Sequence, residues 1–387
     1  MRIFFDCRML FMSGIGRYLQ NILTYFPCLQ DDLRFTLAGE PGQIDGFLKK
    51  EPALRGTTRE IVNFSSPVYS PGEQVYGSLL LCRYAKKNDI CHFPHYSVPW
   101  LVPENSVVTV HDLTHFRFPE YFGRAKVKLA GIILRNAVKK VGKIIVISRS
   151  TANDLERMFP GINYKCRLIY QGVADFFRPR PENVVENFKK KRSLNRYLLY
   201  VGNRKPHKNL GRLLQAYSSV ERKIPDLQLV IAGKKFEPRD EVTQFQEKNK
   251  LPGIIEIEEA ADEELLNLYC GAEALVLPSL YEGFGLSPLE AMACGTPTAV
   301  SKVASLPEVV GDAGFYFDPS DVRDMAQVIY RVLTDQHLRQ HLHEKGLARV
   351  RFFTWEKVAR QTLEVYQEVL NKRRKNLKFF IDINYRV

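Results

Sequence analysis

Short apolar strands alternate with amphipathic helices over the second half of this chain, and this alternation limits the possible folds more than any other feature. The expected elements are a strand at 197–201, a helix at 209–220, strands at 227–232 and 254–257, a helix at 262–269 and a strand at 274–277. Strands that are connected through helices run parallel, because the crossover returns the chain to the same end of the sheet. The pattern therefore predicts an α/β fold with a doubly wound parallel sheet.

The first half of the chain repeats this rhythm less regularly. Its expected strands are residues 3–5, 35–38, 107–110 and 144–147. We therefore predict two doubly wound domains, residues 1–178 and residues 196–355. The segment 179–195 begins rich in proline and charge and is expected to be a linker. The last amphipathic stretch, 356–387, is expected to complete the first domain.

Length and composition narrow the class of protein. The chain has 387 residues, more than one hydrophobic core usually organises. Its apolar runs are far shorter than the roughly 20 residues of a membrane-spanning helix, and Asp6 interrupts any secretory signal. Seven cysteines without a CxxC pair indicate neither a disulfide framework nor a zinc site. A cytoplasmic protein is expected.

The formal net charge of +13 predicts an anionic partner, such as a membrane surface or a phosphate group. Part of this charge lies in residues 121–143, which have the periodicity of a basic amphipathic helix. Two interpretations stay open: a solvated helix face above a core, and a helix that docks on an anionic membrane leaflet at the inner face of the cell membrane. No nucleic-acid-binding motif accompanies the charge, so a nucleic acid partner is not expected.

Ligands of open α/β sheets bind beyond the carboxyl ends of the strands, where loops meet helix amino termini. Two such loops lie in the first half of the chain. One contains Gly14 and Gly16 and, without the third glycine of a dinucleotide fingerprint, is by itself typical of an ordinary loop. The other follows the strand 107–110 with His111, which fits a structural role and a catalytic role equally well.

A third loop, GNRKPHKN, concentrates positive charge between a strand and a helix. A helix amino terminus is already positive, so these cations repel one another unless an anion holds them. The loop predicts a phosphate or diphosphate site, with Arg204 and Lys208 as the candidate ligands.

The fourth loop and the helix start after it read YEGFGLSPLEAM. Gly283 and Gly285 leave backbone N–H groups able to approach a phosphate, and Glu282 and Glu290 flank them. Carboxylates repel phosphate but bind the hydroxyl groups of an attached sugar, so a sugar nucleotide is the predicted ligand. The stretch also matches a capping box with Ser287 as N-cap, which leaves a structural role open for Glu290. We predict that the Glu290 carboxylate points toward the ribose.

Together these motifs resemble the retaining GT-B glycosyltransferases of family 4. The carboxyl half is similar over YVGNRKPHKNL, LVLPSLYEGFGLSPLEAMACGTPTAVS and LPEVVGDAGFYFDPSD, and the amino half agrees more loosely over GIGRYLQNIL, VVTVHDLTHFRFPE and VISRSTANDL. Glu282 and Glu290 match the Glu-x7-Glu motif of that family. The resemblance implies two Rossmann-like domains that face each other across a cleft, as in bacterial mannosyltransferase-like enzymes of lipopolysaccharide and O-antigen synthesis.

The resemblance also implies a role for each candidate residue. Glu282 would bind hydroxyls of the transferred sugar, and Glu290 would bind the ribose. Lys208 and an arginine would neutralise the diphosphate, although many members carry that arginine where this chain has Asn203, one position before Arg204. His111 would lie near the anomeric centre, and Gly14 and Gly16 would line the cleft. The donor would also contact Gly283, Phe284, Gly285 and Leu286.

The reaction that the resemblance implies is retaining transfer of a hexose, with mannose weakly favoured, from a GDP- or UDP-linked donor to a lipid-linked or polysaccharide acceptor. The chain contains no Asp-x-Asp pair, so we expect cationic side chains instead of a metal to stabilise the leaving diphosphate, and no cofactor. Two alternatives stay open. One is an epimerase or phosphorylase with the same fold, and the other is a non-enzymatic basic protein that binds membranes or nucleic acid.

Overall fold

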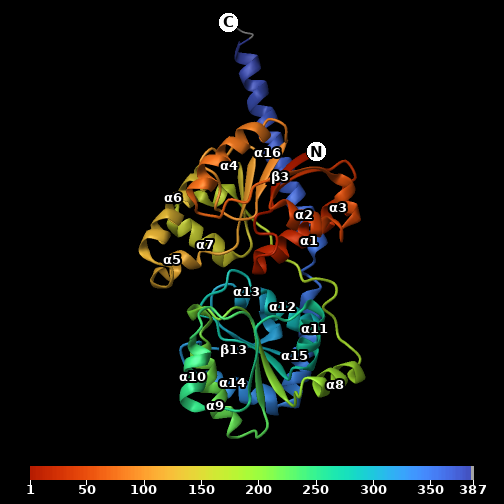
Figure 1. Ribbon diagram of the computed structural model, residues 1–387, viewed down its shortest axis with the longest axis vertical. Coiled ribbons are helices and arrows are strands. Elements are labelled where there is room, and N and C mark those ends of the chain that lie inside the picture. Colours follow the sequence, from red (N-terminus) through yellow and green to blue (C-terminus); the bar gives the residue numbers. More distant parts are fainter. Residues whose placement is uncertain (385–387) are drawn as a thin grey trace. The chain divides into compact units, whose positions relative to one another are not determined.

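The chain folds into two compact units, each built on its own parallel sheet (Figure 1). The computed structural model describes residues 1–384, with side chains as far as residue 374. The first unit contains Met1–Gly172 and the C-terminal segment from Trp355 onward, and the second unit contains Val173–Thr354. This architecture confirms the predicted fold class, two doubly wound Rossmann-like domains.

The first unit has a seven-stranded parallel sheet in the order β3-β2-β1-β4-β5-β6-β7. Its strands are β1 (Arg2–Asp6), β2 (Arg34–Gly39), β3 (Thr58–Asn63), β4 (Ile90–Phe93), β5 (Ser106–Val110), β6 (Lys143–Val146) and β7 (Cys166–Leu168). All four strands that we predicted in this half are present. The strands β3, β4 and β7 were not predicted, because two are short and β3 is mostly polar.

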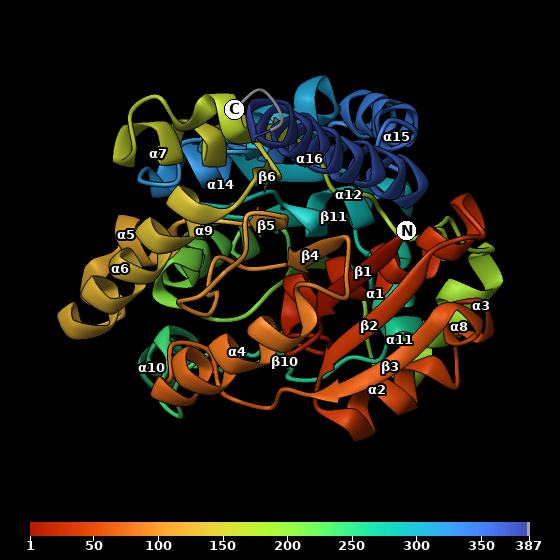
Figure 2. The same cartoon turned by 90° about the horizontal axis from the view of Figure 1, so that it is seen from above.

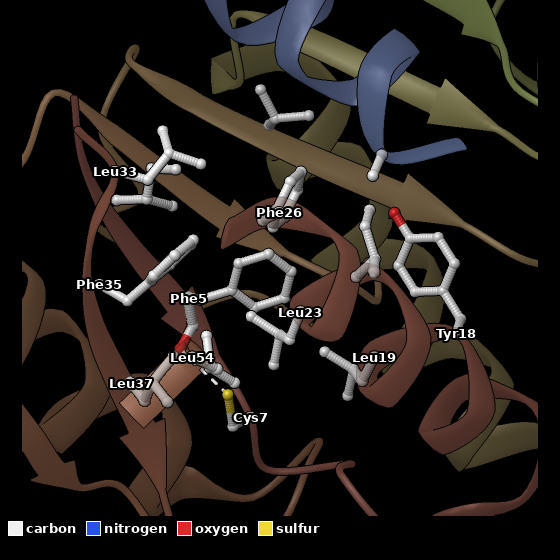
Figure 3. Close-up of a cluster of buried hydrophobic side chains, with 14 of the residues drawn as sticks. Phe5, Cys7, Tyr18, Leu19, Leu23, Phe26, Leu33, Phe35, Leu37 and Leu54 are labelled. Carbon is white, nitrogen blue, oxygen red and sulfur yellow. Dashed lines mark hydrogen bonds between the residues drawn. The ribbon is translucent and has the colours of Figure 1, made fainter. Parts of the chain in front are cut away.

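Helices cover both faces of this sheet. They are α1 (Ser13–Leu29), α2 (Pro41–Leu48), α3 (Pro52–Thr57), α4 (Pro71–Tyr84), α5 (Thr114–Arg117), α6 (Arg124–Lys140), α7 (Arg149–Met158) and α16 (Trp355–Asn384), with 3-10 turns η1 (Pro119–Tyr121) and η2 (Ile162–Lys165). Successive side chains of a strand point to opposite faces. Phe5 accordingly packs with Phe26 of α1 in one hydrophobic cluster (Figure 3), and Phe4 packs with residues of α4 and α6 in another.

The C-terminal helix α16 belongs to the first unit although it follows the second unit in sequence. It lies along α1 and against β4, β5 and β6 (Figure 2). Buried Tyr366 of α16 is hydrogen-bonded to Nδ1 of His92, whose Nε2 lies 2.9 Å from Oγ1 of Thr109. Residues 385–387 of the predicted helix 356–387 lie outside the described residues. No helix in the described part of the chain has both the length and the apolar character needed to cross a membrane.

The second unit has a six-stranded parallel sheet in the order β10-β9-β8-β11-β12-β13. Its strands are β8 (Tyr197–Val201), β9 (Gln228–Ala232), β10 (Ile254–Ile257), β11 (Ala274–Leu277), β12 (Thr298–Ser301) and β13 (Gly314–Phe317). Its helices are α8 (Glu182–Lys191), α9 (Leu210–Glu221), α10 (Glu241–Asn249), α11 (Asp262–Gly271), α12 (Leu286–Ala293), α13 (Leu306–Val310), α14 (Val322–Thr334) and α15 (Gln336–Val350), with 3-10 turns η3 (Pro206–Lys208) and η4 (Gly311–Ala313). Strands β8, β10 and β11 have the predicted bounds.

The segment 179–195, which we predicted to be a linker between the domains, contains α8 and belongs to the second unit. Val185 of this helix is buried, and Phe188 packs against the hydrophobic cluster that includes Tyr197 and Tyr269. The second unit therefore begins at Val173 and not at residue 196. The proline and charged residues lie at the start and on the exposed face of this segment. The apolar side chains of Val185 and Phe188 pack it against the rest of the unit.

Candidate active site

The candidate site of the second unit lies where the strand order of its sheet reverses, at β8 and β11. These two strands are neighbours, and the chain leaves them toward opposite edges of the sheet. Such a switch point is where open α/β sheets bind ligands. The two loops that follow the strands are tied together, since Leu280 N–H donates to the carbonyl of His207 at 2.8 Å. The hydroxyl of Ser287 in α12 donates to the carbonyl of Val201 in β8 at 3.0 Å.

Lys208 and Glu282, which we predicted as ligands from separate loops, form an ion pair in this site. The Lys208 Nζ lies 2.7 Å from Oε1 of Glu282, and the hydroxyl of Ser279 donates to the same oxygen at 2.7 Å. Both charged side chains are largely shielded, with 13% and 14% of their surface exposed. Oε2 of Glu282 takes no hydrogen bond from the residues that the structure describes. The carboxylate is thus held by one oxygen and can offer the other to a hydroxyl group.

The loop that carries Glu282 is held in shape by Ser305. The Ser305 hydroxyl lies 2.9 Å from the carbonyl oxygen of Glu282 and 2.8 Å from that of Phe284. The Phe284 side chain is buried and makes an edge contact with Phe353, which anchors the loop. Gly285 has φ +104°, and a Cβ there would lie 2.8 Å from Leu306 Cδ2. Only glycine fits this conformation and this contact, so the glycine is required by the shape of the loop.

The predicted capping box is wrong. Helix α12 starts at Leu286 with Gly285 as its N-cap, which places Ser287 inside the first turn. The Ser287 hydroxyl donates to β8 and does not cap the helix. The helix starts instead after Gly285, which has a left-handed conformation and no side-chain cap. Half-buried Gly283 and Leu286 lie on either side of this turn. The amino terminus of α12 therefore keeps backbone N–H groups that no side-chain cap satisfies.

Glu290 is buried beneath the first turns of α12, with 5% of its surface exposed. Its Oε2 accepts a hydrogen bond of 2.7 Å from the hydroxyl of Tyr269 in α11. The side chain is thus fixed by the neighbouring helix. Its contact with a ribose stays a prediction.

Arg204 lies in the predicted loop after β8, where its side chain forms ion pairs within the second unit. Its side chain is completely buried, with NH1 at 2.6 Å from Oε2 of Glu256 and 3.6 Å from Oδ2 of Asp240. These ion pairs connect the ends of β8 and β10 with the start of α10. The Nε and NH2 atoms of Arg204 are buried and have no hydrogen-bond partner among the described residues, and the role of Arg204 at a diphosphate stays a prediction. The sequence placed the arginine in the correct loop but contained no signal for partners on other elements.

The remaining predicted residues, His111, Gly14 and Gly16, lie in the first unit. His111 directly follows β5 and is buried, with its Nδ1 at 3.0 Å from Nε2 of Gln171 and the ring of Tyr18 edge-on at 5.0 Å. Burial lowers the pKa of His111 to about 4, although Asp112 and the Pro94 carbonyl act in the opposite direction. The imidazole is therefore neutral at pH 7.

Gly14 and Gly16 lie in the first turn of α1, which starts at Ser13. Gly14 is half-buried and Gly16 is buried. A Cβ at Gly16 would lie 2.8 Å from the carbonyl oxygen of Leu10, so glycine allows the preceding loop to pack on the helix. This packing explains Gly16 by itself, and the predicted donor contact of the two glycines stays a prediction.

Four residues of the site were missed from the sequence: Tyr269, Ser279, Ser305 and Asn209. Asn209 adopts a left-handed conformation with φ 61° and donates its side-chain N–H to the carbonyls of Pro278 and Pro319 at 2.9 and 2.8 Å. Ser279 sits three residues before Glu282, and its proximity to the motif was the one available signal. The other contacts join separate elements, and no spacing reveals them.

Comparison with known proteins agrees with this geometry. Residues 184–349 match the family described as glycosyl transferases group 1, and residues 12–175 match glycosyltransferase family 4. The O-antigen chain mannosyltransferase B of Escherichia coli is 32% identical over 85% of this chain and 84% of its own length. The serotype-specific mannosyltransferase WbdA of Escherichia coli is 28% identical over 72% of this chain, which spans 34% of that longer protein.

The fold comparison gives the same architecture. The solved structure of sucrose-phosphate synthase from Thermosynechococcus elongatus has a TM-score of 0.76 and 20% identity, with 96% of this chain and 99% of that chain covered. At this identity the likeness shows the fold, and the family follows from the matches in sequence. The chain belongs to the GT-B glycosyltransferases of family 4 and is a glycosyltransferase.

Proposed function

We propose that this enzyme transfers a hexose from a nucleotide diphosphate sugar to a lipid-linked or polysaccharide acceptor, with retention of configuration and without a metal or cofactor. Mannose is the favoured hexose, because two similar proteins are named O-antigen chain or serotype-specific mannosyltransferases. A GDP- or UDP-linked donor is the proposed substrate. The observation that carries the proposal is the shielded group of Lys208, Glu282 and Ser279 at the switch point of the second sheet.

Each member of this group has a proposed task. Oε2 of Glu282 accepts hydrogen bonds from hydroxyls of the bound hexose, while Ser279 and Lys208 hold Oε1. The Lys208 ammonium also faces the leaving diphosphate, together with the backbone N–H groups around Gly283 to Leu286 at the start of α12. Glu290, held by Tyr269, binds the ribose of the nucleotide.

Charge stabilisation is the main demand of this chemistry. Glycosyl transfer develops positive charge at the anomeric carbon and negative charge on the departing diphosphate. Because the Arg204 side chain is buried and its NH1 is paired with Glu256, Lys208 is the proposed cation for that charge. In the proposed retaining reaction, the leaving phosphate accepts the proton of the acceptor hydroxyl. Neutral His111 offers a hydrogen bond near the anomeric centre.

The acceptor side of the proposal concerns the membrane. A lipid-linked acceptor lies at a membrane surface, so we propose peripheral association with the inner face of the cell membrane. The net charge of +13 supports an anionic surface as the partner.

The proposal is tested with a panel of GDP- and UDP-linked hexoses in a thermal-shift assay, followed by transfer assays with the donor that binds. A ligand that binds only the folded protein raises the melting temperature. Glu282→Gln is expected to lower transfer by about 100-fold or more, as for the loss of a group that acts in the transition state. Glu259→Gln is the matched control, because Glu259 belongs to an exposed ion pair with Lys234 in the same unit. Full transfer by the Glu282→Gln enzyme, or no stabilisation by any donor, would refute the assignment.

A further inference from the structure

One face of the first unit exposes large apolar side chains from two segments. Val75 and Leu79 project from α4, and Trp100 and Leu101 lie in the loop between β4 and β5; each is at least 49% exposed. We call these four residues the apolar patch. Single exposed apolar residues are ordinary, but a cluster of large ones marks an interaction site.

Hydrogen bonds hold the two segments against each other and against α6. The backbone N–H of Leu101 donates to the hydroxyl of Ser78 in α4 at 3.2 Å. From α6, Asn136 Nδ2 and Lys140 Nζ donate to the carbonyl oxygen of Trp100 at 3.2 and 2.7 Å. The Lys140 ammonium also lies 5.3 Å from the centroid of the Trp100 ring. The loop between β4 and β5 thus contacts both α4 and α6.

Helix α6 adds positive charge beside the apolar patch. It contains six basic residues and no acidic residue: Arg124, Lys126, Lys128, Arg135, Lys139 and Lys140. Exposed Lys86 and Lys87 follow α4. The acidic residue of α4, Glu73, is buried and paired with Arg8 at 2.7 Å, so it does not offset this charge. Glu104, in the same loop as Trp100 and Leu101, is exposed, so the surface is apolar at its centre and predominantly basic around it.

The apolar residues of α6 are divided between the core and the surface. Ile133, Leu134 and Val138 are buried, as a helix face above a core requires, whereas Leu129 and Ile132 are 39% and 47% exposed. The buried residues are not available to a membrane. The basic residues of α6 remain at the surface, and the apolar patch next to them supplies a larger apolar anchor than Leu129 and Ile132 alone.

We propose that the apolar patch and the basic residues of α6 dock on an anionic lipid leaflet. Trp100 fits the headgroup region, where tryptophan is enriched, and Val75 and Leu79 reach the acyl boundary. The lysines bind anionic headgroups while their stems cover apolar surface. This inference rests on the proposed function in one respect, because the leaflet would hold the lipid-linked acceptor.

The charge of the surface decides against a second copy of this chain as the occupant. A two-fold interface would bring the same patch of each copy together and oppose α6 with α6. Six like charges on each side would repel, whereas an anionic leaflet attracts them. An acidic protein is the other partner that this charge would attract, and the experiment below separates it from lipid.

The experiment is co-sedimentation of the full chain with vesicles of phosphatidylcholine alone or with phosphatidylglycerol. The wild type is expected to pellet only with the anionic vesicles. The variant Val75→Ser, Leu79→Ser is expected to bind about tenfold more weakly, from the loss of buried apolar area. The variant Lys126→Gln, Lys128→Gln, Lys139→Gln is expected to bind about 100-fold more weakly, since each lysine near an anionic surface contributes about fivefold.

Matched variants of the second unit serve as controls. Phe352→Ser removes an equally exposed apolar side chain, and Lys190→Gln, Lys191→Gln, Lys248→Gln removes the same charge from exposed positions. Both controls are expected to pellet like the wild type. The inference is overturned if the wild type stays in the supernatant with anionic vesicles, as for a protein partner, or if the patch variants bind like the controls. A change in self-association by the patch variants without vesicles would assign the face to a second copy and also overturn it.

Calorimetry with the nucleotide sugars separates this inference from the proposed function. The patch and lysine variants are expected to bind a donor like the wild type, since both lie in the first unit and outside the candidate donor site. Vesicle binding without donor binding would refute the proposed function and leave the docking surface standing. Donor binding without vesicle binding would refute the docking surface and leave the proposed function standing.

Discussion

Tyr269 donates its hydroxyl proton to Oε2 of Glu290 at 2.7 Å, and both residues are buried. The pair joins α11 to α12 behind the loop that carries Glu282. A buried carboxylate that loses a hydrogen-bond donor costs about 1–3 kcal/mol. Tyr269 therefore stabilises the unit and also sets the direction of the carboxylate that we propose as the ribose ligand.

Replacement of this tyrosine tests both effects. Tyr269→Phe is expected to lower the free energy of unfolding by about 1–2 kcal/mol and to weaken donor binding, because Glu290 loses the group that orients it. Urea unfolding and calorimetry measure the two quantities. Tyr217→Phe is the matched control: the buried Tyr217 hydroxyl donates to the carbonyl of Leu227 at 2.7 Å in the same unit. A similar loss of stability with unchanged donor affinity is expected there, and equal donor affinity in both variants would contradict the orienting role.

Ser279 gives a prediction about Glu282. Ser279→Ala removes one of the two donors to Oε1 and leaves Lys208, so the carboxylate is held less firmly but keeps its charge. We expect transfer to fall by about tenfold, which corresponds to the roughly 1.4 kcal/mol of one hydrogen bond to a charged group. Lys208→Met is expected to cost more than Ser279→Ala, because it also removes the cation at the diphosphate. Initial rates at saturating donor measure both, and the opposite ranking would refute the proposed role of Lys208.

The buried ion pairs of Arg204 give a prediction about stability. Arg204→Met would leave Glu256 and Asp240 without their shared partner and is expected to lower the free energy of unfolding by about 3–5 kcal/mol. Arg239→Met is the control, because Arg239 pairs with Glu247 at the surface and such pairs contribute about 0–1 kcal/mol. Urea unfolding of both variants is the measurement. A stable Arg204→Met protein that had lost donor binding would support the diphosphate role that we predicted.

The sequence predicted much of the second unit because its signals are local. The strands 197–201, 254–257 and 274–277 are uninterrupted short runs that are mainly apolar and bounded by polar or turn residues, and the structure keeps their bounds. The candidate donor loops were found for the same reason: charge and glycine gather within a few residues at strand ends. The meeting of Lys208 with Glu282 then followed from the neighbouring positions of β8 and β11 in a doubly wound sheet.

The features that the sequence did not reveal are mostly contacts between elements that are distant in sequence. The partner of Arg204 lies 52 residues away on β10, so the loop alone made the arginine appear available. Helix α8 was not predicted because it has few apolar residues. Val185 and Phe188 are its main apolar contacts, and their packing against the rest of the unit cannot be read from the sequence. The capping box failed because the N-cap is Gly285, whose positive φ starts the helix at Leu286, and Ser287 then lies within reach of β8.

Three histidines of the first unit make stability depend on pH. Burial lowers the pKa of His92 and that of His95 to about 3, and that of His111 to about 4, from an ordinary value of 6.5. Between pH 6.5 and about 4 the unfolded chain therefore binds more protons than the folded chain, so stability is fully present above pH 6.5 and falls as the pH decreases through this window. Each histidine contributes up to about 1.4 kcal/mol per pH unit.

The pH dependence is measured from urea unfolding at pH 7.0, 6.0 and 5.0. His92→Gln is expected to lower stability at pH 7, because it disturbs the bonds to Tyr366 and Thr109, and to reduce the slope between pH 6 and 5. His111→Gln is expected to reduce the slope in the same way. His341→Gln changes an exposed histidine of the second unit and should leave the slope unaltered. A slope that is the same in all three variants would show that other groups cause the acid sensitivity, whereas the predicted order would tie it to the buried imidazoles beneath α16 and beside β5.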